Sequence, residues 1–550
     1  MIVMEKVLIT SALPYSYSLP HLGNIVGSVL PADVYNRYMK LSGIESVFIC
    51  GSDQHGAKIE LEALKQKKSP EDIANYIHEK MKKLFTDFGI EFTYYGKTHT
   101  EQNKEVVYEF FNALKKNGYI VEKEDMQAYC NFDNVFLFDR FIEGTCPYCG
   151  NLHARGDQCD DCNKLLDPIQ IIKPHCNICG KESIEFKKVK NLALALNKLE
   201  PKIKNFIEQK SKNDWSKNAI NKPLSFIETD GLKQRDITRN LKWGFPVPLS
   251  GYENYVFYVW FDAVISYIGI TKEWTDKWKH YWTDEHIRRV QFMGKDNIEF
   301  HTIVFPAIII GSDLGYKLVD TIRASEFLNS RGVKFSKSRG VGLNIETALD
   351  ILSRDYWRFV LMYLYPDGSD TEFSIEVLTE VVDSIMNDKI GNLVNRVLTI
   401  AKRNAQLIGD KSEFDMPTYK HMISICSNYK YHFEHMDMRS AIKDVVELAE
   451  LGNALMSSTE PWTLIKKGDS TSTKNFSTVM STLILIIKNI GILLYPFTPD
   501  TSKRILDYFD IEDARIADIE LYKRINFNKE IKLIFSKISE DAIAKLNALK

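Results

Sequence analysis

The strongest constraint on the fold is a strand–helix–strand pattern at the beginning of the chain. The apolar stretch Val7–Ala12 predicts a strand, Leu22–Leu41 a helix, and Glu45–Cys50 a second, fully buried strand. A unit of this size implies two parallel strands joined by a right-handed crossover helix. We therefore expect an α/β fold built on a parallel sheet.

Polar residues follow both predicted strands. His21-Leu22-Gly23-Asn24 opens the helix, after a loop that contains Pro14 and Pro20. At a helix N-terminus, unpaired backbone N–H groups and the helix dipole both favour phosphate. Asp53 falls just beyond the second strand, at the edge where open parallel sheets bind their ligands. This edge is therefore the predicted binding site.

A second candidate segment, Lys334-Phe335-Ser336-Lys337-Ser338, lies between Gly332 and Gly340 and carries two lysines three positions apart. Alone, such a loop is usually a solvated surface, and a lone His-x-Gly is usually only a helix start. Together the two segments are suited to bind a nucleotide, because they could hold both ends of its triphosphate while the α-phosphorus is attacked.

Six of the nine cysteines form three Cys-x-x-Cys pairs: Cys146/Cys149, Cys159/Cys162 and Cys176/Cys179. In a reducing compartment, such pairs indicate metal ligands rather than disulfides. The first two pairs supply four thiolates from two tight turns, an arrangement typical of a structural zinc site. A catalytic zinc normally has fewer protein ligands and an open position.

The third cysteine pair is a further knuckle. His153 and His175 lie close enough in sequence to complete a second site with it, although exposed loop positions are an equally good interpretation of both histidines. Spacing alone leaves open which pairs share an ion. The three isolated cysteines are interpreted as small core residues: Cys50, Cys130 and Cys426.

At 550 residues the chain is long enough for three or four domains. The α/β pattern is interrupted from about Tyr119 to Asp230 by short, turn-rich segments, resumes near Arg235, and gives way to amphipathic helices from about Asn387. The expected parts are 1–118 and 233–325 (the two halves of the α/β domain), 119–232 (the insertion), 326–386 (the region of the lysine loop) and 387–550 (the helical part).

Charge and hydropathy limit the partners. The net charge is −2, so any nucleic-acid surface must be a local patch. The N-terminus resembles a strand with an acidic Glu5 and not a leader. The longest apolar runs, Ile303–Ile310 and Leu483–Pro496, are too short or too interrupted to cross a bilayer. A cytoplasmic location is therefore expected.

In order and type, the two phosphate-binding candidates resemble the HIGH and KMSKS signatures of class I aminoacyl-tRNA synthetases. Asn24 replaces the last histidine of the first, and Phe335 the methionine of the second. Essentially the whole chain resembles the methionyl-tRNA synthetase family, of the archaeal-like type with several zinc knuckles. Beside the knuckles, the matching segments are Ala12–Tyr15, Gly51–Gly56, Trp260–Ala263 with Tyr267, Gly294–Asp296, and Phe300-His301.

This resemblance implies a Rossmann-like catalytic domain, an inserted zinc-knuckle connective domain and an all-α anticodon-binding bundle. It implies ATP-dependent activation of L-methionine to methionyl-adenylate and transfer to the 2′-hydroxyl of the terminal adenosine of tRNA(Met). Magnesium is expected with the ATP. The chain stops at Lys550 without an appended oligonucleotide-binding fold, so a monomer is expected.

The resemblance also implies site residues. The expected catalytic residues at the phosphates are His21, Asn24, Lys334 and Lys337. The protein backbone at Gly294 is expected to approach the nucleotide, and Asp296 is expected to hold its ribose. Asp53 is expected to pair with the substrate ammonium. The expected lining of the methionine pocket is Ala12, Leu13, Tyr15, Trp260, Ala263, Tyr267, Phe300 and His301. Val264 stands where the family usually has proline.

The helical part carries the expected tRNA contacts. Asp388–Ala405 predicts a helix in which Asn392 and Arg396 are neighbours, four positions apart. Asparagine and arginine can read the edges of splayed bases, and an aromatic ring such as Trp462 can stack on one. These three residues match the positions with which the resembled family reads the CAU anticodon.

Three alternatives remain open. The chain has features of a class I synthetase for another amino acid, although the leucine, isoleucine and valine enzymes carry a far larger editing insertion. A catalytically silent tRNA-binding paralogue would have no need for His21, Asp53 and Lys337. A small nucleotidyltransferase with a similar histidine motif leaves the helical half unexplained.

Overall fold

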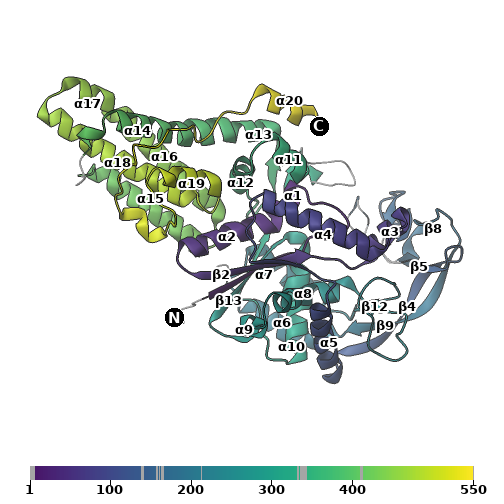
Figure 1. Ribbon diagram of the computed structural model, residues 1–550. Helices are drawn as coiled ribbons and strands as arrows, with labels where there is room; N and C mark the ends of the chain where they lie inside the picture. Colours follow the sequence, from purple (N-terminus) through teal and green to yellow (C-terminus); the bar gives the residue numbers. More distant parts are fainter. Residues whose placement is uncertain are drawn as a thin grey trace.

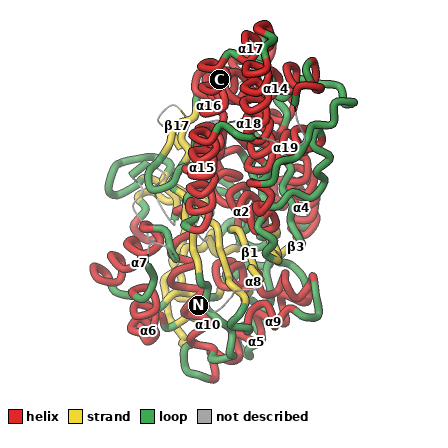
Figure 2. The backbone as a smooth tube through the Cα atoms, turned by 90° about the vertical axis from the view of Figure 1, so that its left-hand side faces the viewer, coloured by secondary structure: helices red, strands yellow, loops and turns green. Residues whose placement is uncertain are grey.

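The computed structural model describes residues 6–137, 141–156, 159, 161–162, 166, 168–211, 214–330, 333–334, 343–408 and 413–548. A parallel sheet occupies the middle of the molecule. Long helices of the C-terminal part lie at one end and the strands of the insertion at the other (Figure 1). In the view turned by 90°, these helices stand above the strands of the sheet (Figure 2).

The central sheet has five strands, all parallel to their neighbours, in the order β14-β13-β1-β2-β3. Their bounds are β1 Lys6–Ser11, β2 Glu45–Ser52, β3 Tyr94–Lys97, β13 Ile287–Gly294 and β14 Thr321–Ser325. The strand order reverses between β1 and β13, and ligands of open α/β sheets bind at such a switch point, outside the carboxyl ends of the strands. The predicted parallel sheet is confirmed.

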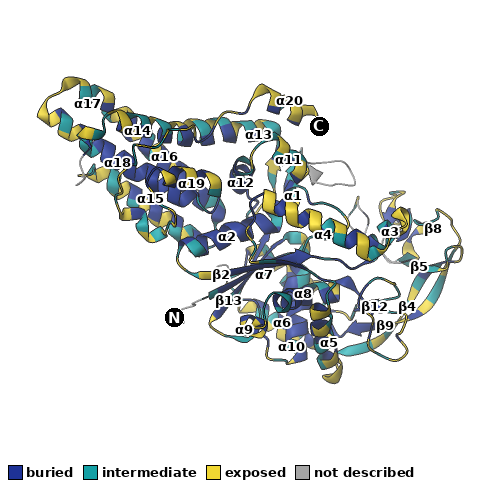
Figure 3. Cartoon of the chain, in the orientation of Figure 1, coloured by how far each residue is buried: buried dark blue, intermediate teal, exposed yellow. Residues whose placement is uncertain are grey.

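Both faces of the sheet are covered by other elements. Because successive side chains of a strand point to opposite faces, neighbouring residues belong to two different cores. Ile9 and Phe48 belong to one core, and Leu8 and Val47 to another. The strands are accordingly buried (Figure 3). The first core contains α2 (Leu30–Leu41) and α4 (Pro70–Asp87) and continues into the C-terminal helices. The second contains α5 (Glu101–Lys116), α6 (Leu196–Glu208), α7 (Lys217–Asp230), α8 (Val259–Trp274), α9 (Trp278–Thr283) and α10 (Phe305–Ser312).

The predicted helix at 22–41 forms, but it is not a uniform α-helix. It consists of α1 (Leu22–Asn24), the π-helical η1 (Ile25–Val29) and α2. Pro31 has no N–H for the carbonyl of Gly27, which instead accepts a hydrogen bond from Ser325 Oγ at 3.0 Å. This bond ties the helix to the end of β14.

The helical segment that follows β13 shows the same irregularity. It begins with the 3₁₀ turn η4 (Lys295–Asn297), continues as the π-helical η5 (Phe300–Val304), and becomes α10. Again a proline, Pro306, stands at the second position of the following α-helix. Both π segments adjoin the carboxyl edge of the sheet, where a widened turn reorients the side chains that point toward it.

The insertion is built on two long antiparallel strands, β4 (Ile120–Cys130) and β9 (Ile184–Leu194), which pair along their full length. With β5 (Val135–Leu137) and β10 (Arg235–Asp236) they form a sheet in the order β10-β9-β4-β5. The cysteine-rich segment between them forms a small sheet of β6 (Ile142–Thr145), β7 (Ala154–Arg155) and β8 (Ile172–Cys176).

The C-terminal part is helical, as predicted. Its main helices are α12 (Arg354–Tyr363), α14 (Asn392–Arg403), α15 (Met416–Glu434), α16 (Met438–Thr459), α17 (Pro461–Lys467), α18 (Ser470–Leu494), α19 (Pro499–Asp507) and α20 (Glu540–Ala548). Helix α18 is long and apolar enough to cross a membrane, but 89% of its most apolar window is buried among the other helices, as expected for a core helix.

Candidate active site and metal centres

A pocket of about 890 Å³ lies at the carboxyl ends of β1, β2, β13 and β14. Its volume is within the usual range for binding sites of small molecules and cofactors. Every residue predicted for the substrate and nucleotide sites whose side chain the structure describes lines this pocket: Ala12, Leu13, Tyr15, His21, Asn24, Asp53, Trp260, Ala263, Tyr267, Gly294, Asp296, Phe300 and His301.

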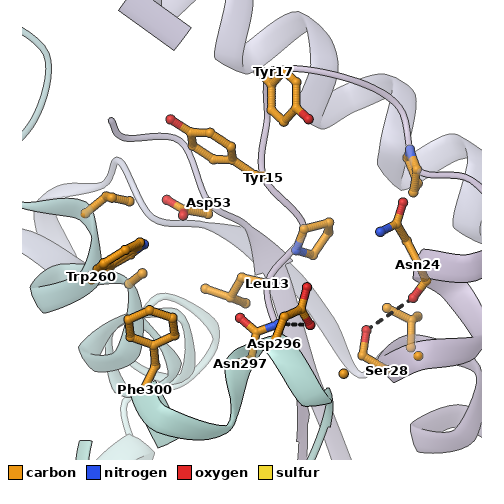
Figure 4. A pocket seen from close by; sticks show the side chains of 18 of the residues that line it. Leu13, Tyr15, Tyr17, Asn24, Ser28, Asp53, Trp260, Asp296, Asn297 and Phe300 are labelled. Carbon is orange, nitrogen blue, oxygen red and sulfur yellow. Dashed lines mark hydrogen bonds between the residues drawn. The ribbon is translucent and has the colours of Figure 1, made fainter. Parts of the chain in front are cut away.

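The side chains divide between two sides of the pocket (Figure 4). Asp53, Trp260 and Phe300 lie on one side, and Asn24 and Ser28 on the other. Asp296 and Asn297 lie between them, on the loop that follows β13. The pocket is therefore elongated, with chemically different ends.

At one end, His21 and Asn24 cap the N-terminus of α1 reciprocally. The Asn24 N–H donates to His21 Nδ1 at 3.2 Å, and the His21 N–H donates to Asn24 Oδ1 at 3.1 Å. Because Nδ1 accepts a hydrogen bond, the neutral imidazole carries its proton on Nε2. His21 thus presents an N–H donor beside the helix N-terminus, which suits an anion.

The lysine loop is anchored at this same end. The Leu22 N–H donates to Leu343 O at 3.2 Å, and His21 forms an antiparallel bridge with Asn344. On the other side of the loop, β16 (Val333–Lys334) pairs with β15 (Leu328–Ser330), whose first residue lines the pocket. Lys337 and the side chain of Lys334 lie outside the described residues. The segments on both sides of Lys337 nevertheless adjoin the pocket.

At the other end of the pocket, Tyr267 and His301 form a neutral polar pair beside apolar and aromatic walls. His301 Nδ1 is 2.9 Å from Asn297 O and donates to it, so Nε2 accepts from the Tyr267 hydroxyl at 2.8 Å. Burial lowers the pKa of His301 to about 4, which keeps the ring uncharged at neutral pH. Trp260 and Phe300 close this end, with ring centroids 4.6 Å apart.

Asp53 follows β2 directly and faces this end (Figure 4). Its backbone is fixed by hydrogen bonds to Pro14 O and from the Ser16 N–H, both part of the loop after β1. Burial, together with the nearby Asp262, raises the pKa of Asp53 well above its usual range. A carboxylate in this position favours a cationic ligand, which would stabilise its ionised form.

Sequence reasoning missed Arg235. Its guanidinium lies 4.8 Å from the ring centroid of Trp260 and 5.1 Å from that of Phe300, and it lines the pocket. Burial lowers the pKa of Arg235, so the fold keeps a desolvated cation there. The residue lies where the α/β pattern resumes after the insertion. No motif and no helix or strand pattern in the sequence distinguishes it from an ordinary surface arginine.

The first cysteine cluster matches its prediction. The Sγ atoms of Cys146 and Cys162 are 3.8 Å apart, and those of Cys149 and Cys159 are 3.6 Å apart. Four sulfurs at about 2.3 Å from a tetrahedral zinc lie about 3.8 Å from one another. The donor set and its spacing therefore fit a structural zinc ion.

The second cluster corrects the prediction. Cys176 and Cys179 gather with Cys130 and Asp133, not with a histidine. Cys130 Sγ lies 3.8 Å from Cys179 Sγ, and Asp133 Oδ2 lies 3.1 Å from Cys176 Sγ. Cys130 is thus not merely a core residue. Cys130 and Asp133 have the Cys-x-x-Asp spacing of a metal knuckle in which a carboxylate replaces one thiolate. This spacing could have identified Cys130 as a candidate ligand from the sequence.

The two histidines proposed for that second site point elsewhere. His153 Nδ1 is 2.8 Å from Glu143 Oε1, and His175 Nε2 is 3.9 Å from the same oxygen. Neither belongs to a candidate metal cluster among the described residues. Of the two interpretations left open for these histidines, the structure does not support the metal-ligand one, because β4 ends beside the third knuckle and delivers Cys130 and Asp133 to it.

At the far end of the molecule, the structure brings two of the predicted tRNA contacts together. The Arg396 guanidinium on α14 lies 5.7 Å from the ring centroid of Trp462 on α17. Asn392 is exposed one turn before Arg396 and donates to Asp388 Oδ1 at 3.3 Å. The exposed amide of Asn392, the guanidinium of Arg396 and the ring of Trp462 thus form one surface.

Comparison with known proteins identifies two families along the chain. Residues 7–398 match the model described as "tRNA synthetases class I (M)". Residues 408–548 match the model described as "Anticodon binding domain of methionyl tRNA ligase".

Curated relatives are similar over the full length. The methionine–tRNA ligase of Borrelia garinii subsp. bavariensis is 40% identical over 556 residues, covering 100% of this chain and 75% of that protein. That of Pyrobaculum calidifontis is 38% identical over 555 residues, covering 99% and 96%. The fold matches Mycobacterium tuberculosis methionyl-tRNA synthetase bound by methionyl-adenylate, with a TM-score of 0.80, 20% identity, and coverage of 96% and 100%.

Proposed function

The chain belongs to the methionine–tRNA ligases, a family of class I aminoacyl-tRNA synthetases, and we propose how its pocket performs the reaction. Methionine is activated with ATP to methionyl-adenylate and then transferred to the 2′-hydroxyl of the terminal adenosine of tRNA(Met). One observation carries the assignment. His21 and both anchors of the lysine loop adjoin the pocket that Asp53 also enters.

In the first step, a carboxylate oxygen of methionine attacks the α-phosphorus of ATP. A new P–O bond forms, and the bond to pyrophosphate breaks. His21 would donate its Nε2–H to the phosphates, with a weaker contribution from the amide of Asn24. Lys334 and Lys337 would neutralise the leaving pyrophosphate, and Mg²⁺ would accompany the triphosphate. The protein contributes positioning and charge neutralisation rather than covalent chemistry.

The apolar end would hold methionine. Asp53 would pair with the ammonium, while Arg235, the desolvated cation, would approach the carboxylate. The Tyr267–His301 pair is neutral and satisfied by hydrogen bonds, so a charged side chain would find no partner there, whereas a thioether needs none. The remaining walls would be Ala12, Leu13, Tyr15, Trp260, Ala263 and Phe300.

The turn after β13 would hold the nucleotide. A Cβ on Gly294 would lie 2.8 Å from Asp296 Oδ1, so only glycine lets this carboxylate fold back against the backbone. Asp296, exposed at the middle of the pocket, would accept hydrogen bonds from the ribose hydroxyls.

Transfer requires tRNA, for which we propose the surface of Asn392, Arg396 and Trp462 as the anticodon contact. Trp462 would stack on one base of CAU, and the two polar side chains would read base edges. A monomeric state and a cytoplasmic location stay predictions. Light scattering of the purified chain tests the first, and cell fractionation tests the second.

Both cysteine clusters would hold zinc, which supplies no step of the reaction and instead crosslinks the small sheet of the insertion. Metal analysis of the purified chain is expected to give two zinc ions. The Asp133→Ala variant is expected to retain one, and Cys149→Ala to lose the other. One ion in the unaltered chain would contradict the second site.

Amino-acid-dependent exchange of pyrophosphate with ATP, measured with all twenty amino acids, tests the assignment. Methionine is expected to dominate. Exchange with leucine instead would move the chain to another class I specificity. No exchange, with tRNA binding retained, would favour the silent paralogue.

A further inference from the structure

Behind Asp53 lies a row of three titratable side chains, two of them fully buried, that the reaction above does not use. Asp262 Oδ2 is hydrogen-bonded to His55 Nδ1, and His55 Nε2 lies 2.8 Å from His99 Nδ1. His55 and Asp262 are both 0% exposed. They come from three elements: the end of β2, the first turn of α8, and the turn after β3.

Aromatic rings pack against the two histidines of this row, of which His99 is partly exposed. His99 lies against Trp243, with centroids 4.3 Å apart, and His55 meets the edge of Phe245 at 4.6 Å. The Trp243 indole N–H donates to the carbonyl of Gln54, beside His55. None of the three side chains lines the pocket, so they act on a substrate only through other residues.

Two carboxyl groups meet at this wall. Burial and the nearby Asp262 raise the pKa of Asp53. Burial also raises the pKa of Asp262, while its hydrogen bond with the His55 ring opposes that rise. Asp262 stands in the first turn of α8, where the helix dipole favours a carboxylate.

The hydrogen bonds orient the His55 ring from both sides. The Asp262 carboxyl group holds its Nδ1 side, and His99 Nδ1 holds its Nε2 side. Burial lowers the pKa of His99 to about 4, so His99 is neutral at pH 7. Lys97 and Lys104 also lower the pKa of His99, and Lys58 lowers that of Asp53.

We propose that His55 is a positioning residue for methionine, an inference that rests on the proposed function. Its backbone N–H donates to Asp53 Oδ1 at 3.3 Å, while its ring holds Asp262, which lies in the same helical turn as Trp260 and Ala263. His55 thus joins the wall that binds the ammonium to the wall that binds the side chain.

Steady-state pyrophosphate exchange with the full-length protein tests this role. His55→Leu and Asp262→Leu are each expected to raise KM for methionine about tenfold to a hundredfold, with KM for ATP within about threefold. His55→Asn, which keeps a donor near the Nδ1 position, is expected to recover most of the loss. His432→Leu is the matched control, because it breaks a similar His–Asp pair, 2.6 Å long, in the helical part.

A spectroscopic measurement covers the case in which a leucine variant does not fold. In ¹⁵N NMR of the unaltered protein, the proton on His55 Nδ1 is expected to exchange slowly with solvent, and in Asp262→Asn to exchange faster, because a neutral amide accepts more weakly than a carboxylate. No such protected proton in the unaltered protein, or equal rises of both KM values in folded variants, would overturn the inference while leaving methionine-dependent exchange intact. Absence of that exchange in the unaltered protein would instead overturn the proposed function.

Discussion

The two ends of the pocket solve different physical problems. At the methionine end, Tyr267 and His301 are 2% and 4% exposed and satisfied by each other and by the backbone. At the phosphate end, Asn24 is exposed and His21 is half-buried at a helix N-terminus, beside the anchors of a basic loop. In the proposed reaction, the first end is a preformed binding site for the amino acid, whereas the second places hydrogen-bond donors where negative charge develops.

This difference implies a separation of kinetic effects. Contacts in a preformed site act on the bound substrate and its transition state alike, so their loss raises KM. Groups that meet the pentavalent phosphorus act mainly in the transition state, so their loss lowers kcat. Variants at the two ends can therefore test whether the two kinetic effects are separate.

The largest effect is expected for His21→Ala. Loss of the Nε2–H donor is expected to lower kcat of pyrophosphate exchange by about two to three powers of ten, with KM for methionine within about threefold. The helix cap is also lost, at about 1 kcal/mol of stability, so thermal unfolding is the accompanying measurement. If KM for methionine rose as much as kcat fell, the two ends would not be separable.

Next in size is Asp53→Asn. The amide keeps the shape and still accepts the N–H of His55, but it no longer neutralises an ammonium. KM for methionine is expected to rise about a hundredfold, with kcat at saturation reduced less than tenfold. Calorimetric titration with methionine alone gives the same comparison without ATP. An unchanged affinity would remove Asp53 from the ammonium site.

Tyr267→Phe is expected to have a smaller effect. It leaves His301 Nε2 buried without its donor, and KM for methionine is expected to rise about tenfold. Tyr108→Phe is a suitable control, because that hydroxyl donates to Pro246 O at 2.8 Å near the surface. Equal rises of KM for methionine in both variants would show that the Tyr267–His301 hydrogen bond has no special role in methionine binding.

The smallest effect concerns pH. Burial raises the pKa of Asp53 above its ordinary value, and only the ionised form pairs with an ammonium. KM for methionine is therefore expected to rise as pH falls through that pKa, by at most about tenfold per pH unit. In Asp53→Asn this rise is expected to disappear, which distinguishes Asp53 from the other titrating groups.

Local patterns predicted much of the pocket. The strand before Ala12 and the strand before Asp53 were visible as apolar runs, and both carry a ligand-facing residue at their carboxyl ends. A cap such as His21 is defined by its own helix. These features depend on neighbours within a few residues, so one sequence is enough to predict them.

Features assembled from distant segments escaped prediction. Cys130 and Asp133 reach the third knuckle only because β4 and β9 pair in one register. Arg235 reaches Trp260 only because the chain returns from the insertion at the pocket. His55 and Asp262 meet across 207 positions of sequence.

The amino-acid sequence was sufficient to predict the parallel sheet, the residues at its carboxyl edge and the four-cysteine cluster, because strand periodicity, helix capping and knuckle spacing are short-range properties. The three-dimensional packing was needed to show which polar groups lie together: the second cluster of candidate metal ligands, the arginine at the pocket, and the histidine row behind Asp53. Such groups are brought together by strand register and helix packing, and their energies depend on separations of a few ångströms that sequence distance does not encode.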